Sequence, residues 1–232
     1  EEVSAIVFEP IQGEGGYIVP PDNFLAGLRK LANKHGILLV ADEVQSGMGR
    51  TGRWFAVEHW GVVPDVMCIA KGVASGMPLG VIVGRKELMT LEPGSHATTF
   101  GGNPVSLAAA EATIEVIREE RLVENAEKVG RMMLKRLKEE QERIEIIGDV
   151  RGKGLMIGVE LVKSRSSKEP AVKELRAVIE GCFKRGLLVI GAGVSTIRIA
   201  PPLSIPYELA EKGLELLLEV LRDVYREVKA LA

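Results

Sequence analysis

The chain has 232 residues, 46% of them apolar, and its 30 Lys and Arg against 32 Asp and Glu leave a formal charge of -2. A chain of this length can bury one large or two small hydrophobic cores. The balanced charge provides no broad basic field, which disfavours nucleic acid and anionic lipid as partners and favours small-molecule chemistry.

The two cysteines, Cys68 and Cys182, lie in apolar runs without CxxC spacing, which is typical of the reducing cytoplasm. Charge or glycine interrupts every apolar run well before the roughly 20 residues that a membrane helix needs, so we expect no membrane span. The sequence begins with Glu1 and enters a strand at once, without a tag or signal pattern. We therefore expect a C-terminal piece of a longer protein.

The N-terminal part alternates between apolar runs and a helical pattern. Buried strands are predicted at SAIVFEP, ILLVADE, DVMCIA and LGVIVG. A helix is predicted over NFLAGLRKLANKHG, with Asp22 as its cap, Gly36 as its stop, and apolar positions at helical spacing at Phe24, Leu28 and Leu31. This alternation indicates an α/β fold with a mainly parallel sheet, whose ligands bind at the carboxyl ends of the strands.

The chain beyond Pro104 is dominated by long amphipathic helices, the first of which has Asn103 as its predicted cap. Four short strands are predicted at 146–150, 155–161, 187–190 and 196–200, followed by a helix over 208–232. The pattern predicts a second, smaller α/β domain. We place the first domain at 1–110 and the second at 111–232, with the boundary inside a connecting helix.

Two ionisable residues follow predicted buried strands. Lys71 comes directly after the run 66–70. Asp42 follows the aliphatic run 37–41 and lies 71 minus 42, or 29, residues earlier, which is about one strand-to-strand crossover. A partly desolvated lysine can form a Schiff base, and a buried carboxylate can pair with a protonated pyridine nitrogen. The alternatives are a solvated lysine and a carboxylate, Asp42 or Glu43, that caps nearby backbone.

Other features are compatible with more than one function. ILLVADE would suit a magnesium-binding ATPase strand, but no GK[ST] phosphate loop is present. The hydroxyls in ATTFGGNP can hold a phosphate, or the segment can simply precede a helix. Arg198 lies on the face of a strand opposite to Ile197 and Ile199, where it requires a carboxylate from a substrate or from the protein, unless it is solvated at an edge.

Taken in order, EPIQGEGG, ADEVQSGMGRTG, PDVMCIAKGVASGMPLG, ATTFGGNP and GLMIGVEL resemble the class III, or omega, aminotransferases over nearly the whole chain. The resemblance implies fold type I of the pyridoxal 5'-phosphate (PLP) enzymes, with part of the large domain and the small C-terminal domain present. It implies that Lys71 forms the Schiff base and carries the proton, and that Asp42 pairs with the pyridinium nitrogen.

The same resemblance assigns further contacts with the cofactor. Val44 packs on the ring face and Gln45 hydrogen-bonds the phenolic oxygen. Thr99 reaches the cofactor phosphate of the neighbouring subunit, which implies a homodimer or a higher homo-oligomer.

Three residues are assigned to the substrates, an amino acid and a 2-oxo acid. Arg198 binds the α-carboxylate of an acceptor such as 2-oxoglutarate and pairs with Glu14 when the omega-amine donor occupies the site, while Glu9 lines the pocket. The family's Ser/Gly phosphate loop, its ring-stacking aromatic residue and the arginine for the donor's distal carboxylate have no match in the chain. We therefore expect about the C-terminal half of such an enzyme, which does not hold PLP tightly by itself.

The glutamate of QGEGG favours 4-aminobutyrate, ornithine or acetylornithine as the amino donor, and GRTGRWFAVEHWG is most similar to 4-aminobutyrate aminotransferases. Two alternatives remain. One is a PLP-dependent amino-acid racemase of the same family. The other is a non-catalytic fragment or interaction module that uses its amphipathic helices, 123–144 and the C-terminal one, as an interface.

Overall fold

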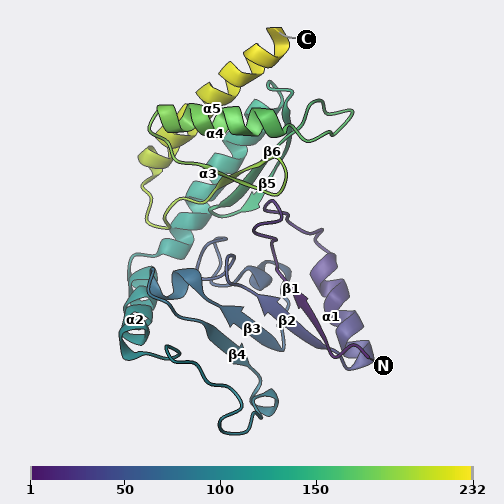
Figure 1. Cartoon of the computed structure of the whole chain (residues 1–232), viewed down its shortest axis with the longest axis vertical. Coiled ribbons are helices and arrows are strands. Elements are labelled where there is room, and N and C mark those ends of the chain that lie inside the picture. The colour runs from purple at the N-terminus through teal and green to yellow at the C-terminus, as the bar shows by residue number, and fades with distance from the viewer. Residues whose placement is uncertain (1, 231–232) are drawn as a thin grey trace. The chain divides into compact units, whose positions relative to one another are not determined.

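The computed structural model describes residues 2–230. The described residues form two compact units, the first made of residues 2–11 and 20–123 and the second of residues 12–19 and 124–230. Each unit contains a four-stranded sheet (Figure 1). The predicted domain boundary between residues 110 and 111 falls inside helix α2 (Pro104–Glu119) and stays a prediction.

The sheet of the first unit has the order β1-β2-β3-β4. Its strands are β1 (Ala5–Phe8), β2 (Leu38–Asp42), β3 (Val66–Ile69) and β4 (Val81–Gly84). The first three are parallel, as the buried runs predicted, whereas β4 pairs with β3 in the antiparallel direction. A parallel return needs a crossover of about a dozen residues or more. The connection over residues 70–80 is shorter, so β4 returns antiparallel.

Helix α1 (Phe24–His35) packs on this sheet beside β1 and β2 (Figure 1). Gly36 ends it in the left-handed conformation, as predicted. The predicted cap is wrong, because Asn23 occupies the N-cap position and no side chain there accepts a hydrogen bond. The predicted apolar face is confirmed at Leu28 and wrong at its two ends: Phe24 and Leu31 are about half exposed, whereas the adjacent Leu25 and Ala32 are buried. Leu25, Leu28 and Ala32 pack together with Leu39 of the sheet.

The rest of the first unit consists of short helical turns and one long helix. The 3-10 turns are η1 (Ala56–Trp60), η2 (Lys71–Ala74) and η3 (Lys86–Leu88), and α2 follows them. The predicted cap of α2 is confirmed, since the Asn103 side chain accepts a hydrogen bond from the Ser106 amide at 2.9 Å. Pro104 at the first helical position lacks only an N–H that would have no helical partner.

The second unit contains the order β5-β6-β8-β7, with all neighbours antiparallel. Its elements are α3 (Leu122–Gln141), β5 (Ile147–Lys153), β6 (Met156–Leu161), α4 (Val172–Lys184), β7 (Ile190–Ala192), β8 (Thr196–Ile199) and α5 (Tyr207–Ala230). The strand predicted at 187–190 begins at Ile190 instead. The last two residues of the predicted C-terminal helix lie outside the described residues.

One face of this second sheet forms the core of the unit. Alternate strand residues, among them Ile157, Val159, Ile197 and Ile199, pack with apolar residues of α3, α4 and α5 (Figure 1). The opposite face carries the charged and polar strand residues. Tight hairpins join β5 to β6 and β7 to β8, and such short connections are possible only between antiparallel strands.

No helix within residues 2–230 is long and apolar enough to cross a membrane. The same residues contain no group of three His, Cys, Asp or Glu side chains placed to hold a metal ion.

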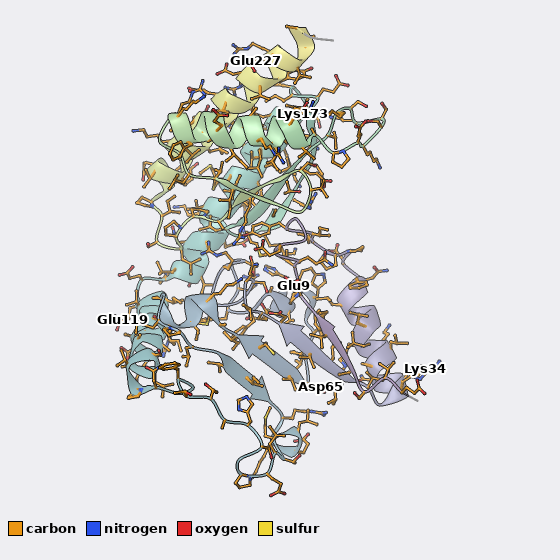
Figure 2. All side chains as sticks on the ribbon, viewed as in Figure 1. Glu9, Lys34, Asp65, Glu119, Lys173 and Glu227 are labelled. Atoms are coloured by element: carbon orange, nitrogen blue, oxygen red, sulfur yellow. The ribbon has the colours of Figure 1, made fainter. Side chains whose placement is uncertain are left out.

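Asp65 precedes β3 and connects three elements of the first unit. Its carboxylate accepts hydrogen bonds from Arg29 of α1 at 2.8 Å and from the Leu39 amide of β2 at 2.7 Å, and it pairs with Arg85 at 3.0 Å. Figure 2 places Asp65 and Glu9 at opposite ends of the strands. This ion-pair cluster therefore lies away from the carboxyl edge of the sheet.

We predict that Asp65→Asn destabilises the full-length protein by about 3 kcal/mol near neutral pH, because it removes one member of a nearly buried ion pair. Burial alone would raise the pKa of this carboxyl, but hydrogen bonds from Arg29 and Leu39 and the charges of Arg29 and Arg85 outweigh it and lower the pKa. The stabilisation is thus present above the ordinary aspartate pKa and disappears as the pH falls through the folded-state value. Denaturant unfolding at several pH values measures both effects.

The matched control is Glu87→Gln, which removes an exposed partner of the same arginine; Arg85 and Glu87 are 3.5 Å apart. We expect a loss below about 0.5 kcal/mol, since exposed ion pairs contribute little. Equal losses for the two variants, or an Asp65→Asn loss that persists in acid, would contradict the prediction.

Candidate cofactor and carboxylate sites

Three of the predicted site residues follow the carboxyl ends of neighbouring parallel strands in the first unit. Phe8 of β1 pairs with Ala41 of β2, and Asp42 pairs with Cys68 of β3, so these strands end at one edge of the sheet. Glu9 follows β1, Asp42 is the last residue of β2, and Lys71 comes two residues after β3. The structure brings these three positions together, as the strand pattern predicted.

Lys71 begins the turn η2 and has a φ of 46°, which is unusual for a residue with a side chain. A hydrogen bond of 2.9 Å from Thr113 of α2 to Ser75 holds the end of this turn. The Lys71 side chain is exposed, and its amine has no hydrogen-bond or ion-pair partner among the described residues. Within residues 2–230 the lysine therefore matches the solvated alternative, and its role at the cofactor stays a prediction.

Asp42 is half-buried, and its Oδ1 accepts a hydrogen bond from the Val44 amide at 3.0 Å. Backbone capping, one of the alternatives considered for this residue, is thus real. It occupies only one of the two carboxylate oxygens, because Oδ2 has no hydrogen-bond donor within the part of the chain that the structure describes. The second oxygen is available to a ligand at the carboxyl edge.

Glu43 organises the loop that follows Asp42, whereas the sequence indicated for it only the capping of nearby backbone. Its side chain is 1% exposed, accepts a hydrogen bond from Ser46 Oγ at 2.5 Å and another from the Val57 amide at 2.9 Å. Its own amide donates to the Cys68 carbonyl at 2.9 Å. One residue therefore links the end of β2, the following loop, η1 and β3.

The loop between β2 and η1 is tightly packed around the predicted cofactor contacts Val44 and Gln45, both of which are half-buried. A Cβ atom at Gly47 would lie 2.8 Å from the Glu43 carbonyl oxygen, so this glycine permits a close approach of the backbone. His59 Nε2 lies 3.0 Å from the Thr51 carbonyl oxygen and closes the loop from η1. This packing fixes the backbone of Val44 and Gln45.

Thr99 lies in a segment that is exposed throughout, and its role at the cofactor phosphate stays a prediction. The neighbouring Thr98 hydroxyl accepts a hydrogen bond from the Gly101 amide at 3.0 Å, which stabilises a turn before α2. Glu9 is exposed as well, and its role in the pocket also stays a prediction.

The second unit contains an ion pair between Arg198 and Glu14. Arg198 Nη1 donates to Glu14 Oε1 at 2.8 Å, and the arginine side chain is 21% exposed, whereas that of the glutamate is 74% exposed. Arg198 lies on β8, an inner strand of the sheet, so it is not an edge arginine. The carboxylate that its position required is supplied by Glu14.

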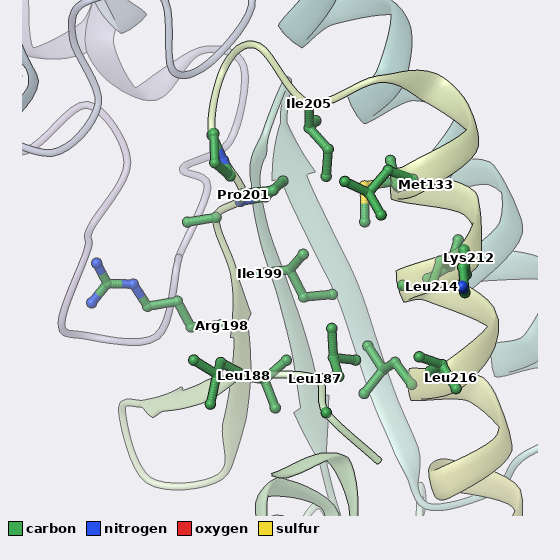
Figure 3. Close-up of a pocket in the computed structure, with 18 of the residues that line it drawn as sticks. Met133, Leu187, Leu188, Arg198, Ile199, Pro201, Ile205, Lys212, Leu214 and Leu216 are labelled. Atoms are coloured by element: carbon green, nitrogen blue, oxygen red, sulfur yellow. The ribbon is translucent and has the colours of Figure 1, made fainter.

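Arg198 and Ile199 point to opposite faces of β8 (Figure 3). On the Ile199 side lies a groove of about 720 Å³. It is lined mainly by apolar residues of α5 and of the segment that leads into β7. On the other side, the Arg198 guanidinium lies over the Tyr17 ring, 5.3 Å from its centroid. The arginine therefore directs its charge away from the apolar groove, toward Glu14 and Tyr17.

The family model for aminotransferase class-III matches residues 1–221. Among similar proteins, an alanine/serine racemase of Pyrococcus horikoshii is 51% identical and a leucine/methionine racemase of Thermococcus litoralis 48% identical, each over 96% of this chain and covering 47% and 50% of those proteins. A 4-aminobutyrate aminotransferase of Mycobacterium leprae is 44% identical over 96% of this chain and 50% of its own length.

A transaminase from the marine bacterium Virgibacillus has a similar solved structure, with a TM-score of 0.89 and 37% identity over 96% of this chain and 53% of that one. The chain therefore belongs to the class III aminotransferases, a PLP-dependent family of fold type I. It spans about half the length of the relatives that it matches.

We predict that Glu43→Ala costs about 2 to 3 kcal/mol, because the Ser46 hydroxyl and the Val57 amide lose a buried acceptor. Glu43→Gln should cost much less, since its carbonyl can accept from Val57 and its amide can donate to Ser46. Thermal unfolding of the full-length variants measures the difference. Equal losses in the two variants would show that these hydrogen bonds do not stabilise the loop.

The same pair gives a pH prediction. Burial raises the pKa of the Glu43 carboxyl, and hydrogen bonds from Ser46, Val57 and Ala56 only partly oppose it. The folded protein therefore holds this proton more tightly than the unfolded chain, and stability declines as the pH rises from the ordinary glutamate pKa through the folded-state value. Glu43→Gln cannot titrate, so its stability relative to the wild type should increase over that range.

Proposed function

We propose that the full-length protein is a PLP-dependent aminotransferase that moves an amino group from an omega-amino acid, of the 4-aminobutyrate or ornithine type, to a 2-oxo acid such as 2-oxoglutarate. The observation that carries this proposal is the Arg198–Glu14 ion pair. An enzyme with two unlike substrates must bind an α-carboxylate in one half-reaction and accept an amine without that carboxylate in the other. An arginine whose charge is balanced by a displaceable glutamate meets both requirements.

The residues of the first unit fit PLP in the chemistry that they offer. Asp42 has an available carboxylate oxygen for the protonated ring nitrogen, and Lys71 has an available amine, at the ends of adjacent parallel strands. Bound PLP supplies an electron sink that stabilises negative charge on the substrate α carbon. Asp42 keeps the ring nitrogen protonated, and Lys71 Nζ carries the proton removed from that carbon.

The remaining assignments rest on the resemblance and on the placement of each residue. Val44 packs on the ring face, Gln45 hydrogen-bonds the phenolic oxygen, and Glu9 lines the substrate pocket. Thr99 binds the phosphate held by a neighbouring subunit, so we propose at least a homodimer. A cytoplasmic location is supported by two cysteines that remain free, Cys68 and Cys182.

A second candidate is an amino-acid racemase of the same family. It is favoured by the 51% and 48% identity to the two racemases, against 44% to the 4-aminobutyrate aminotransferase. A racemase returns the same α-amino acid that it binds, and therefore has no need of an exchangeable carboxylate site. For this reason we rank it below the aminotransferase.

The test of the common chemistry is borohydride trapping of PLP on the full-length protein, with the labelled peptide identified by mass spectrometry. We expect the label on Lys71 and its absence in Lys71→Ala. The same variant should turn over at least about a thousandfold more slowly, because Lys71 has a proton-transfer role. Lys86→Ala, which changes an exposed lysine of η3, is the matched control and should keep both. Failure to label Lys71 would favour a non-catalytic interaction module.

The test between the two enzymes uses substrates with and without an oxo acid. An aminotransferase forms glutamate from 4-aminobutyrate and 2-oxoglutarate, whereas a racemase inverts one L-amino acid without any oxo acid. We expect glutamate formation, and Arg198→Ala should raise the KM for 2-oxoglutarate roughly 30-fold, equivalent to about 2 kcal/mol for a charged hydrogen bond. Rapid inversion of alanine or leucine with no transfer would establish the racemase.

A further inference from the structure

A row of three residues crosses the charged face of the second sheet. Gly158 of β6 pairs with Arg151 of β5 on one side and with Arg198 of β8 on the other. Residues paired across strands in this way point to the same face. Two arginines therefore flank a glycine, and the space above the glycine lies between their side chains.

Tyr17 occupies this space. A Cβ atom at Gly158 would lie 3.0 Å from the Tyr17 Cβ and 3.2 Å from the Gly16 carbonyl oxygen, so a side chain on β6 would displace the segment. Tyr17 is 2% exposed although it belongs to a loop, and its φ of 54° is unfavourable for a residue with a side chain. The burial of the ring offsets this backbone strain.

Arg151 holds the backbone on either side of the Tyr17 side chain. Its guanidinium donates to the Gly16 carbonyl at 2.7 Å and to the Tyr17 carbonyl at 3.2 Å. Glu160 and Asp149 on the same sheet face balance its charge at 2.5 and 2.8 Å. The segment of residues 12–19 is thus fixed to the sheet by an arginine that does not itself reach Glu14.

The Glu14 backbone is fixed as well, because its carbonyl oxygen accepts a hydrogen bond from the Gly193 amide at 2.8 Å in the turn between β7 and β8. The Glu14 side chain, by contrast, is 74% exposed and pairs with Arg198. The carboxylate can therefore swing away from Arg198 while the loop and the Tyr17 ring stay in place.

We propose that Tyr17 is a positioning residue for substrate carboxylate binding. The Tyr17 side chain packs over Gly158, and Arg151 fixes the backbone that carries it. The ring then holds the Arg198 guanidinium through a cation–π contact when Glu14 has moved away. The centroid distance of 5.3 Å lies within the range in which such contacts are attractive. Arg198 is then preorganised for the incoming carboxylate, so the acceptor does not have to order the arginine upon binding. The proposal rests on the substrate role proposed above for Arg198.

The test replaces Tyr17 in the full-length protein with phenylalanine and with phenylalanines that carry one, two and three ring fluorines. Fluorine withdraws electrons from the ring face and weakens a cation–π contact while the ring keeps nearly the same shape. The probe is glutarate, a dicarboxylate that cannot react, and calorimetric titration gives its dissociation constant without any turnover. We expect the affinity to fall stepwise along the series, by about three- to tenfold between Tyr17→Phe and the trifluorinated variant.

The chain provides a matched control in the same unit. Lys128 lies over the Tyr207 ring, with its Nζ 6.0 Å from the centroid, so the same fluorinated series at Tyr207 weakens a comparable contact elsewhere. That series should leave glutarate binding unchanged. A flat series at Tyr17, or an equal decline at both positions, would overturn the proposal. Single-turnover kinetics add a second readout, in which the series at Tyr17 should raise the half-saturating 2-oxoglutarate concentration and leave the limiting rate unchanged.

Arg198→Ala separates this proposal from the proposed function. If Arg198→Ala does not weaken glutarate binding, then Arg198 is not the carboxylate site, and both proposals are wrong. If Arg198→Ala weakens binding but the fluorinated series at Tyr17 is flat, only the role of Tyr17 is wrong. A loss at Arg198 together with a graded loss at Tyr17 supports both.

Discussion

The parallel pairing of β2 with β3 is the constraint on which the candidate cofactor site depends. Residues 29 positions apart in sequence, Asp42 and Lys71, come to one edge because parallel strands end on the same side of their sheet. The buried Glu43 then holds that edge in place by accepting hydrogen bonds from the loop and from η1 while its amide bonds to β3. A change that shifted this pairing by one residue would turn Asp42 to the other face of the sheet.

The second unit positions its candidate site residues differently from the first. Its sheet is antiparallel, so its chemistry lies on a face rather than at an edge. The core side of β8 is apolar, and the opposite side presents Arg198 beside a glycine that leaves room for Tyr17. The loop that carries Glu14 is fixed by its backbone, whereas the Glu14 carboxylate that pairs with Arg198 is largely exposed, as the proposed exchange of counter-ions requires. A fixed backbone and an exposed carboxylate thus occur within one short segment.

The charged groups of the first unit follow one physical principle, that a charge removed from water must meet an opposite charge or strong hydrogen bonds. Asp65 meets Arg29, Arg85 and the Leu39 amide, and its pKa is lowered in spite of burial. Glu43 meets only neutral donors, and its pKa is raised. Asp42 and Lys71 differ from both, because each offers atoms that the described residues do not satisfy. That difference separates stabilising charges from those available to a ligand.

The sequence by itself indicated most of the strands and the family, because buried apolar runs, the Asp42 and Lys71 that follow two of them, and the alternation around Arg198 are local patterns that can be recognised without knowledge of packing. It also predicted the Arg198–Glu14 pair through the resemblance. It misplaced the cap and apolar face of α1, because a shift of one position along a helix changes the pattern little and only contact with Leu39 decides it. The position of Tyr17 between Arg151 and Arg198 was decided by the tertiary structure alone. Strand register places Arg151 and Arg198 on either side of Gly158, and hydrogen bonds then join Arg151 to a loop residue 134 positions earlier, a contact that no local pattern encodes.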